Sequence, residues 1–570
     1  MSRFETRDRA RTTQNEGPQA ASQAVLQTQV TWREWLGQRT WPLAMLAALG
    51  SFLALPPVGW WPLVFLAPAP WLWLARAPKL PGSHPYRALW LSGLAFWMGT
   101  LHWLRLPHPA TSIGWVALAA YLACYIPALV ALVRVAVHRY RVPLALAAPV
   151  VWLGLELLRG HLLTGFTMAS LGHAPYRWLE FIQIADLCGA YGVSAAVMFF
   201  AAIVARMVPC DGEQLSWKPI VPGAIVLGLI LGYGYARTAQ SPTRPGPKVA
   251  LIQGSIDPSL KHDPEKQAEV SRHYYDLSVQ AVAQDADLDL LVWPETMYRG
   301  MLLERAPGSP PPEQFSEEQY ERRLEQSRAA ISSLARNLNV PLLLGVDTFE
   351  VNGEEHRSFN SALFVERDGP LGTRYDKMHP VLFGEYIPFG KQFPWLYRLT
   401  PLGGGLTAGE TPQYGRAAGA VIAPNVCYET VVPHVICRQV RELASAGHEP
   451  DVLVNITNDG WYLGSSALDL HLMCGVFRAV ECRKPLLIAA NTGFSASIDS
   501  NGRILAQGPR RATGIIVANT LLDDRESPYL LWGDYPAGAC LALCALLAVQ
   551  GLRRRNDEFL NLNVESNPND

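Results

Sequence analysis

The chain has 570 residues, of which 17% are charged, and its formal net charge is -1 at pH 7. Without a basic excess it lacks a surface that complements phosphates, so we exclude a nucleic-acid partner. Soluble proteins carry roughly 25% charged residues, and this deficit together with 18 Trp favours a membrane protein. No Asp or Glu occurs between Glu34 and Glu156, whereas residues 250–525 have an ordinary charge content. The chain therefore combines a membrane part with a soluble part.

Residues 1–38 are polar and rich in Arg, Gln and Ser, which predicts a disordered cytoplasmic leader rather than a cleaved signal peptide. Seven apolar stretches follow within 39–236, and an eighth falls within 528–552, before a cytoplasmic tail at 553–570. Each approaches the length of about 20 residues that crosses a bilayer, so we expect eight transmembrane helices. The predicted spans lie near 41–56, 60–76, 88–105, 113–134, 142–158, 181–207, 219–236 and 529–551.

Basic loop residues predict the orientation, because Lys and Arg accumulate on the cytoplasmic side. They precede the first span and follow spans two, four, six and eight, whereas the loops after spans one and three are nearly bare. Arg159 and Arg177, after span five, are an exception. Glu156 either pairs with Arg159 or lines a lipid entry. We expect both termini in the cytoplasm and residues 237–527 outside it, in the periplasm of a cell with two membranes.

Residues 237–527 have the pattern of an α/β domain. After a predicted linker at 237–248, short runs that are apolar on both faces end in polar residues, as in "LDLLVWPE", "AVIAPNVCYE" and "DVLVNITND". Helical stretches at 317–339 and 466–483 interleave with them, and Asn501-Gly502 in "IDSNGRIL" is a hairpin signal. Such runs indicate strands buried beneath helices.

Polar residues gather where the predicted strands end, namely Glu295, Cys427, Asn458 and Asp459. In open α/β sheets the ligand lies outside the carboxyl ends of the strands, so these residues are expected to meet. A lone cysteine is most often buried filler. Cys427 becomes a candidate nucleophile only with a base or a cation beside it, because a thiol with a pKa of about 8.5 is barely ionised at neutral pH.

Two partners for the thiol are available. Glu295 can take its proton, and Lys377 in "RYDKMHPVLFGEYIPF" can stabilise both the thiolate and the oxyanion that forms on an attacked carbonyl. His379 offers the alternative of a Cys–His dyad. The nine cysteines have no metal-ligand spacing, so we expect no metal and no cofactor.

The motifs "WPE", "YDKMHPVLFGE" and "CYE", in this order, resemble the Glu–Lys–Cys signature of the nitrilase superfamily. With seven predicted spans before this domain and one after it, the chain resembles the apolipoprotein N-acyltransferase family, the membrane-integral branch of that superfamily. "LLRGHLLTGF", "QIADLCGAYGVSAAV" and "NDGWYLG" extend the resemblance over about 40–552. It implies an αββα sandwich on an eight-helix membrane domain in the bacterial inner membrane.

By position, the resemblance makes Glu295 the general base, Lys377 the electrophilic stabiliser and Cys427 the nucleophile. Glu385 matches a second acid that orients Lys377. The implied reaction moves a fatty acyl chain from a phospholipid to the cysteine as a thioester. From there it passes to the α-amino group of a diacylglyceryl lipoprotein. We expect a monomer with membrane lipids around it; the alternatives are a membrane-tethered amidase or nitrilase that releases product to water, and a non-catalytic scaffold.

Four further residues have expected supporting roles. Tyr428 and Glu429 match residues that shape the acyl and amine pockets, and the backbone N–H of Tyr428 is a second oxyanion donor. Trp395 lies in the stretch 393–415, which is either a flexible surface connection or a mobile lid that touches the membrane or the acyl chain. Trp461 is either a second lipid contact or a packing residue.

The chain departs from the family pattern at five positions. It has "GFTM", with Thr167 and Met168, where "GFPW" is usual, and "HPVLFGE", with Pro380 and Leu382, where "HLVPFGE" is usual. His262 in "SLKHD" stands where Trp is common. The three catalytic motifs are intact, so the resemblance implies the family's chemistry and leaves the acyl-donor preference open.

Overall fold

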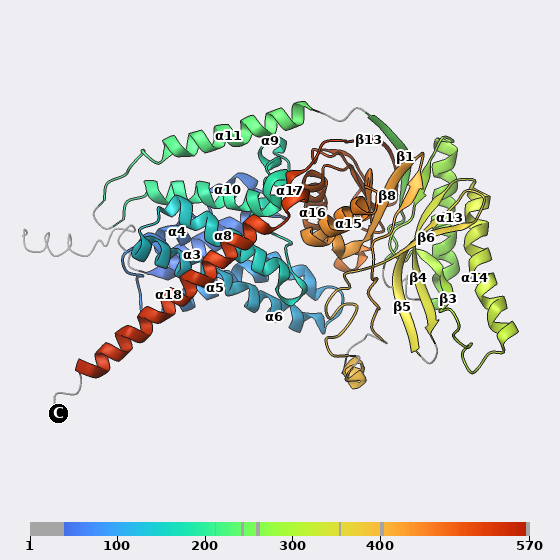
Figure 1. Cartoon of the computed structure of the whole chain (residues 1–570), viewed down its shortest axis with the longest axis horizontal. Helices are drawn as coiled ribbons and strands as arrows, with labels where there is room; N and C mark the ends of the chain where they lie inside the picture. The colour runs from blue at the N-terminus through green and yellow to red at the C-terminus, as the bar shows by residue number, and fades with distance from the viewer. Residues whose placement is uncertain are drawn as a thin grey trace, which may run out of the picture.

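The computed structural model describes residues 39–210, 213–240, 244–257, 263–352, 355–390, 392–399 and 404–565. A bundle of helices occupies one end of the molecule and two sheets occupy the other (Figure 1). The leader expected at 1–38 and the departure at His262 lie outside the described residues.

Several helices of the bundle are long enough to cross a membrane. In the described part of the chain, five apolar helical segments qualify by length and composition: Thr111–Arg139, Leu144–Thr164, Ala185–Met207, Ile220–Ala239 and Tyr535–Arg553. The helices of the bundle are α3 (Thr40–Ala54), α4 (Ala69–Arg76), α5 (Pro85–Thr100), α6 (Thr111–Ala123), α7 (Tyr125–Arg134), α8 (Leu144–His161), α10 (Ala185–Met207), α11 (Ile220–Ala239) and α18 (Tyr535–Glu565). The expectation of a membrane domain with several spanning helices is thus confirmed, whereas the count of eight is not.

The span expected at 60–76 is wrong as a single helix. The segment folds as a 3-10 turn, Trp61–Phe65, followed by α4, which has only 8 residues and is about 12 Å long. Pro62, Pro68 and Pro70 explain the break, because proline lacks a backbone N–H and is tolerated at a helix start rather than in its interior. The linker expected at 237–248 is shorter than predicted, since α11 continues to Ala239 and the first strand begins at Arg244.

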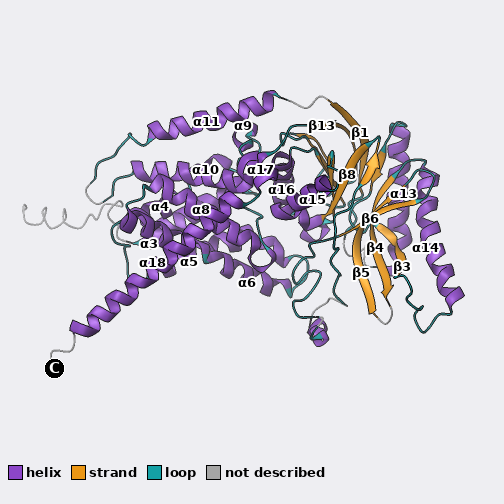
Figure 2. Cartoon of the chain, viewed as in Figure 1, coloured by secondary structure: helices purple, strands orange, loops and turns teal. Residues whose placement is uncertain are grey.

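The soluble part contains two sheets (Figure 2). In the first, the order is β13-β1-β2-β4-β5-β6, and β3 pairs with β4; in the second it is β12-β11-β10-β9-β8-β7. The first sheet contains β1 (Arg244–Gln253), β2 (Leu290–Val292), β3 (Tyr298–Arg305), β4 (Leu342–Asn352), β5 (Glu355–Val365), β6 (Leu371–Asp376) and β13 (Gly514–Leu522). The second contains β7 (Gly415–Ala417), β8 (Ala420–Val426), β9 (Val452–Thr457), β10 (Leu486–Ala490), β11 (Ala496–Ile498) and β12 (Ile504–Gln507).

The two sheets pack face to face between helices, which gives the expected αββα layering. Successive residues of β1 face opposite sides: Val249 and Leu251 join the core between the sheets, while Ala250 and Ile252 pack beneath α13 (Gln267–Gln284) and α14 (Glu317–Leu338). On the other side, α15 (Pro433–Ser445) and α16 (Ala467–Cys482) share one apolar core with the membrane helices. The helices predicted at 317–339 and 466–483 and the hairpin at Asn501-Gly502 are confirmed.

Buried polar contacts hold α16 and its flanking residues against the bundle. Arg483, directly after α16, pairs with Asp186 of α10, with Nη2 and Oδ2 2.6 Å apart. The Glu481 carboxylate accepts from the backbone N–H of Ala190 at 2.7 Å, just beyond the point where α10 departs from helical geometry at Gly189. These contacts therefore fix the end of α16 and the start of β10 against the membrane part.

Candidate active site

Cys427 occupies a sharp turn at the carboxyl end of β8. Its φ is 52°, in the left-handed region that side chains other than glycine avoid at a cost on the order of 1 kcal/mol. The chain then enters a short 3-10 helix, Cys427–Val431, rather than continuing as strand. Cys427 is a partly buried residue at the end of a fully buried strand. The position is that of a reactive side chain rather than of core filler.

Lys377 follows β6 and is almost fully buried between two carboxylates. Its Nζ lies 2.6 Å from Glu385 Oε1 and 3.6 Å from Glu295 Oε1. Burial alone would lower the pKa of Lys377, but Glu385, Glu295 and the Cys427 thiol together raise it above its ordinary value. Glu385 Oε2 accepts from the backbone N–H of Val381 at 2.7 Å, so the acid is held in turn. Lys377 is therefore a fixed ammonium ion.

Glu295 follows β2 and is held by hydrogen bonds to both oxygens. Asn360 donates to Oε1 at 2.7 Å, and the backbone N–H of Asn458, at the end of β9, donates to Oε2 at 2.9 Å. The carboxylate is buried, with 6% of the residue exposed. Residues from both sheets therefore fix the orientation in which Glu295 faces Lys377.

The charges of these groups act on the Cys427 thiol. Burial raises the pKa of Cys427 well above its ordinary value, and Glu295 raises it further, while Lys377 opposes both. The thiol is therefore protonated at rest and needs a base to become a nucleophile. The structure brings together Glu295, Lys377 and Cys427, which the sequence placed at separate strand ends.

The ring of His379 packs against other aromatic rings. Its ring stacks on Tyr428, with centroids 6.2 Å apart, and meets His434 edge-on at 6.5 Å. Burial lowers the pKa of His379, and the Lys377 charge lowers it further. Among the described residues no hydrogen bond joins the His379 ring to Cys427, so the Cys–His alternative gains no support from the structure.

The expectation that Glu429 shapes a substrate pocket is corrected. Its carboxylate is fully buried, and it accepts backbone hydrogen bonds from Met378 at 2.7 Å, His379 at 3.0 Å and Val426 at 2.6 Å. Tyr375 donates its hydroxyl to the same group at 2.9 Å. Because its acceptor sites are filled by the protein, Glu429 positions the segment after β6, which carries Lys377, beside the nucleophile's turn.

Tyr428 connects the nucleophile's turn to the membrane part. Its hydroxyl donates to the Gly165 carbonyl at 3.0 Å, in the loop after α8. In the same loop, Thr167 donates to the Val431 carbonyl at the other end of the 3-10 helix. Thr167 is one of the departures from the family pattern, and here it makes a direct contact with the element that carries Cys427.

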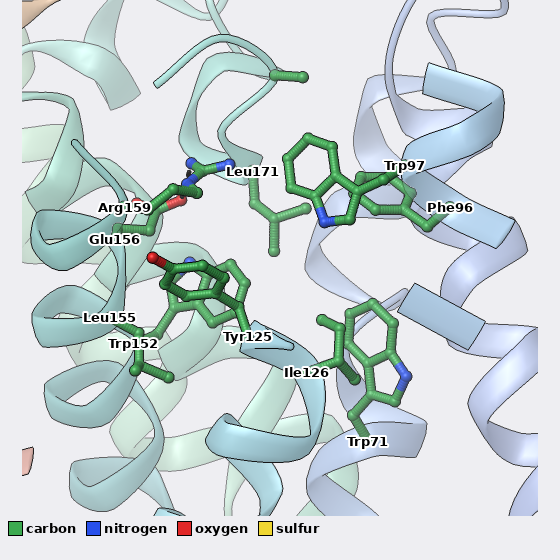
Figure 3. Close-up of a pocket in the computed structure, with 11 residues that line it drawn as sticks. Trp71, Phe96, Trp97, Tyr125, Ile126, Trp152, Leu155, Glu156, Arg159 and Leu171 are labelled. Atoms are coloured by element: carbon green, nitrogen blue, oxygen red, sulfur yellow. Dashed lines mark hydrogen bonds and ion pairs between the residues drawn. The ribbon is translucent and has the colours of Figure 1, made fainter. Parts of the chain in front are cut away.

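The buried pair Glu156–Arg159 contacts the loop after α8 through Ser170. The two side chains pair at 3.2 Å and line a pocket of the bundle, with the guanidinium over the Trp97 ring (Figure 3). Arg159 also donates to the Ser170 hydroxyl at 2.6 Å, and Ser170 donates to the Thr167 carbonyl at 2.8 Å. Of the two interpretations open from the sequence, the structure supports the pair.

The two expected lipid contacts lie at the surface. Trp395, in the short 3-10 helix Pro394–Leu399, is 56% exposed, and the nearby residues Phe389 and Phe393 are exposed as well. Trp461 is 37% exposed, whereas its neighbour Tyr462 packs on Trp103 of the membrane part with ring centroids 4.8 Å apart. Phe389, Phe393 and Trp395 thus place three exposed aromatic side chains within seven residues of the chain.

Sequence reasoning missed two features of the site. Asn360, which holds Glu295, is a buried amide in the strand "SFNSALFV", next to the buried Ser361, and these polar residues in an otherwise apolar strand were the available signal. His471 of α16 contacts Asp459 at 3.0 Å; burial lowers the pKa of His471, but Asp459 outweighs it and the pKa is raised. No signal in the sequence joins residues 459 and 471.

An αββα sandwich with glutamate, lysine and cysteine at its strand ends defines a carbon–nitrogen hydrolase domain. Residues 248–527 match the Carbon-nitrogen hydrolase family, and residues 47–203 match the Apolipoprotein N-acyltransferase N-terminal domain.

Relatives that match nearly the whole length of the chain share one family name. The Apolipoprotein N-acyltransferase of Geobacter metallireducens is 36% identical over 534 residues, covering 91% of this chain and 96% of that protein. The one from Rhodopirellula baltica is 31% identical over 557 residues, covering 89% and 97%. A solved amidase from Nesterenkonia sp. AN1 is 18% identical with a TM-score of 0.33, covering 50% of this chain and 96% of that chain. The chain belongs to the apolipoprotein N-acyltransferase family.

Proposed function

We propose that the protein transfers a fatty acyl chain from a phospholipid, through a thioester on Cys427, to the α-amino group of the N-terminal diacylglyceryl-cysteine of a lipoprotein. One observation carries the proposal: a buried cation and a buried carboxylate act on the Cys427 thiol, next to a bundle of membrane helices. Both substrates are lipids, which accounts for a catalytic domain joined to apolar helices at both ends.

In the first step Glu295 takes the proton of the Cys427 thiol, and the thiolate attacks the ester carbonyl of the phospholipid. Lys377, oriented by Glu385, and the backbone N–H of Tyr428 stabilise the oxyanion. The C–O bond of the ester then breaks. Glu295 returns the proton to the leaving oxygen, which gives a lysophospholipid and an acyl thioester on the enzyme.

In the second step the lipoprotein amine attacks the thioester carbonyl. The Lys377 ammonium again stabilises the oxyanion, and Glu295 accepts a proton from the amine nitrogen. The C–S bond breaks, an amide forms, and the thiolate regains its proton from Glu295. An amine attacks a thioester readily, so the acyl-enzyme serves as the common intermediate of a two-step transfer.

The membrane arrangement belongs to the same proposal. We infer eight spans, the second of which is the broken segment at 61–76 rather than one continuous helix. We further infer a membrane domain at 39–236, a periplasmic catalytic domain at 237–527, an eighth helix at 528–552, cytoplasmic termini and a monomer. The chain order supports this, because the strands of both sheets lie between α11 and α18, and these two helices are apolar. The short helix α17 (Pro528–Trp532) directly precedes α18. The basic loops described above support the orientation.

Trp395 and Trp461 would contact the lipid substrates. Both are exposed aromatic side chains, and Trp461 stands between Asp459, close to the thiol, and Tyr462, packed on the membrane part. A Trp ring suits a membrane interface, because it combines an apolar body with one N–H donor.

The test mixes purified full-length protein with phospholipid and a diacylated lipopeptide. The proposal predicts that the peptide gains one fatty acyl chain and that lysophospholipid accumulates in equal amount. Free fatty acid without acylated peptide would instead identify a membrane-tethered hydrolase. A Cys427→Ala variant controls for transfer without the enzyme's thiol.

A further inference from the structure

Apart from the catalytic residues, three potential metal ligands from three segments meet at the junction of the two domains. His161 ends α8, His434 lies in the first turn of α15, and Asp534 stands between α17 and α18. One ligand atom from each lies within 4.8 Å of the other two. The helices α8 and α18 run side by side along the bundle (Figure 1), so the three segments are held together by the fold itself.

In two of these side chains, one polar atom is already held by a hydrogen bond within the protein, which leaves the other polar atom for a ligand. His161 Nδ1 lies 3.1 Å from the Leu157 carbonyl, which can only accept, so Nδ1 carries the proton and the lone pair is on Nε2. That Nε2 lies 3.9 Å from Asp534 Oδ2. Asp534 Oδ1 accepts from the Tyr529 hydroxyl at 2.5 Å. A histidine whose second nitrogen donates to a carbonyl, beside a carboxylate with one oxygen hydrogen-bonded, is the usual surrounding of a metal site.

His434 adds an unsatisfied group. Its ring stacks on His161 with centroids 4.2 Å apart, and its Nδ1 is buried without a hydrogen-bond partner. Stacking alone would leave the buried nitrogen unpaired at a cost of about 1–3 kcal/mol.

We propose that His161, His434 and Asp534 bind one zinc ion that fastens the catalytic domain to helices α8 and α18. Two imidazoles and one carboxylate form a nitrogen and oxygen set that suits zinc, with water in the fourth position. Bonds of about 2.0–2.2 Å put the ligands of a tetrahedral zinc ion about 3.3 Å apart. The ligand atoms lie within 4.8 Å of one another, so they must close by up to about 1.5 Å, and the stacked His161 ring must turn until both imidazole lone pairs point at the ion. His161 can make that movement, because 46% of its side chain is exposed.

The ion is structural in this proposal and takes no part in bond breaking. His434 follows Cys427 by a few residues, in the helix that begins directly after the nucleophile's 3-10 turn. Asp534 begins the segment that leads into α18. One ion would thus join the chain just after the nucleophile to the last apolar helix.

The test uses full-length protein in detergent, freed of metal with a chelator and titrated with Zn²⁺ alone. We expect one tightly bound ion per chain and a rise of several degrees in the thermal midpoint when zinc is added. The variants His161→Asn and Asp534→Asn should bind zinc at least about tenfold more weakly and lose the thermal shift. The matched control is His356→Ala, which removes an exposed histidine on β5 and should bind like the wild type.

His161 is half-exposed, so its replacement is not expected to disturb the fold. A second readout uses Co²⁺ in place of zinc: four-coordinate cobalt absorbs visible light, and this absorption should disappear in His434→Gln and His161→Asn. Zinc affinity and cobalt absorption equal to wild type in both variants would overturn the proposal. So would the absence of a one-equivalent zinc site in the wild type.

Discussion

This protein contains two buried clusters of charged side chains, and they differ in which charge is in excess. At the domain junction, the carboxylate of Asp186 accepts from Tyr233, Arg237 and Arg483 at 2.6–2.9 Å. That carboxylate is outnumbered by guanidinium groups, and its oxygens are occupied. Its chemistry is complete, and its function is to hold the domains together.

In the candidate active site the balance is reversed. One ammonium, Lys377, lies between the carboxylates Glu385 and Glu295, and a protonated thiol completes the group. The extra carboxylate has a proton to take, and the ammonium has a charge to stabilise once a substrate carbonyl is attacked. Burial of charge alone therefore does not mark a catalytic site; an excess of one charge beside a nucleophile does.

The largest effect is expected at Glu295, in the active-site cluster. Glu295→Gln keeps the size and the hydrogen bond from Asn458 but removes the base, so the acylation rate should fall by about 10²–10⁴-fold. The fold should be unchanged, because both hydrogen bonds to the replaced group come from neutral donors and Lys377 keeps its shorter ion pair with Glu385 at 2.6 Å. Acylation is measured as thioester formed from phospholipid per unit time. A rate within a few-fold of wild type would assign the base to another residue.

A change in the cluster around Asp186 should lower the stability of the protein rather than its catalytic rate. Arg483→Met leaves the Asp186 carboxylate buried with one cation fewer, which should cost about 3 kcal/mol in the free energy of unfolding and lower the thermal midpoint. The rate per folded molecule should stay close to wild type. Arg503→Ala, at an exposed position, is the matched control. A lost rate with an unchanged midpoint would move Arg483 into the catalytic machinery.

A smaller effect is expected at Glu385, and it should appear in the pH profile. Glu385 is the foremost neighbour raising the pKa of Lys377, so Glu385→Gln should lower that pKa. Because the reaction needs the ammonium form, activity at high pH should be lost at a lower pH than in wild type. At neutral pH the rate should fall about tenfold through the loss of one charged hydrogen bond. An unshifted alkaline limb would contradict the proposed role of Glu385.

The smallest effect concerns the exposed aromatics. Trp395→Ser removes an exposed ring that we assign to lipid contact, so KM for phospholipid in vesicles should rise about fivefold, with kcat nearly unchanged. Leu505→Ser, at a comparably exposed apolar position on β12, is the control and should leave KM unchanged. An equal rise in both variants would show that Trp395 has no special role.

Much of this could be predicted from the sequence, for physical reasons. Buried strands with polar residues at their ends predicted an α/β domain with a site at the strand ends, and the family resemblance added the αββα layering. The pattern could not show that Glu295 and Cys427 end strands of two different sheets, which meet only because the sheets pack face to face. Hydropathy overestimated the stretch 60–76, because it counts apolar residues and ignores the prolines that divide the helix. Glu429 could not be interpreted from its neighbours alone, since two of the three backbone N–H groups that it accepts from lie some 50 residues away, at Met378 and His379.

The three proposed zinc ligands show the same limit more strongly. Metal motifs are recognised by short spacings, and the cysteines show none, so the sequence predicted no metal. His161, His434 and Asp534 come from a membrane helix, a catalytic-domain helix and the junction before the last helix. Only the folded chain brings them together.

The central claim is that the Cys427 sulfur carries the acyl chain. Intact mass measurement of full-length protein mixed with phospholipid, followed by peptide mapping, tests it most directly. The account predicts one added fatty acyl group, located on the peptide that contains Cys427, labile to hydroxylamine and absent from Cys427→Ala. An acyl group found on another residue, or one that persists in Cys427→Ala, would contradict it.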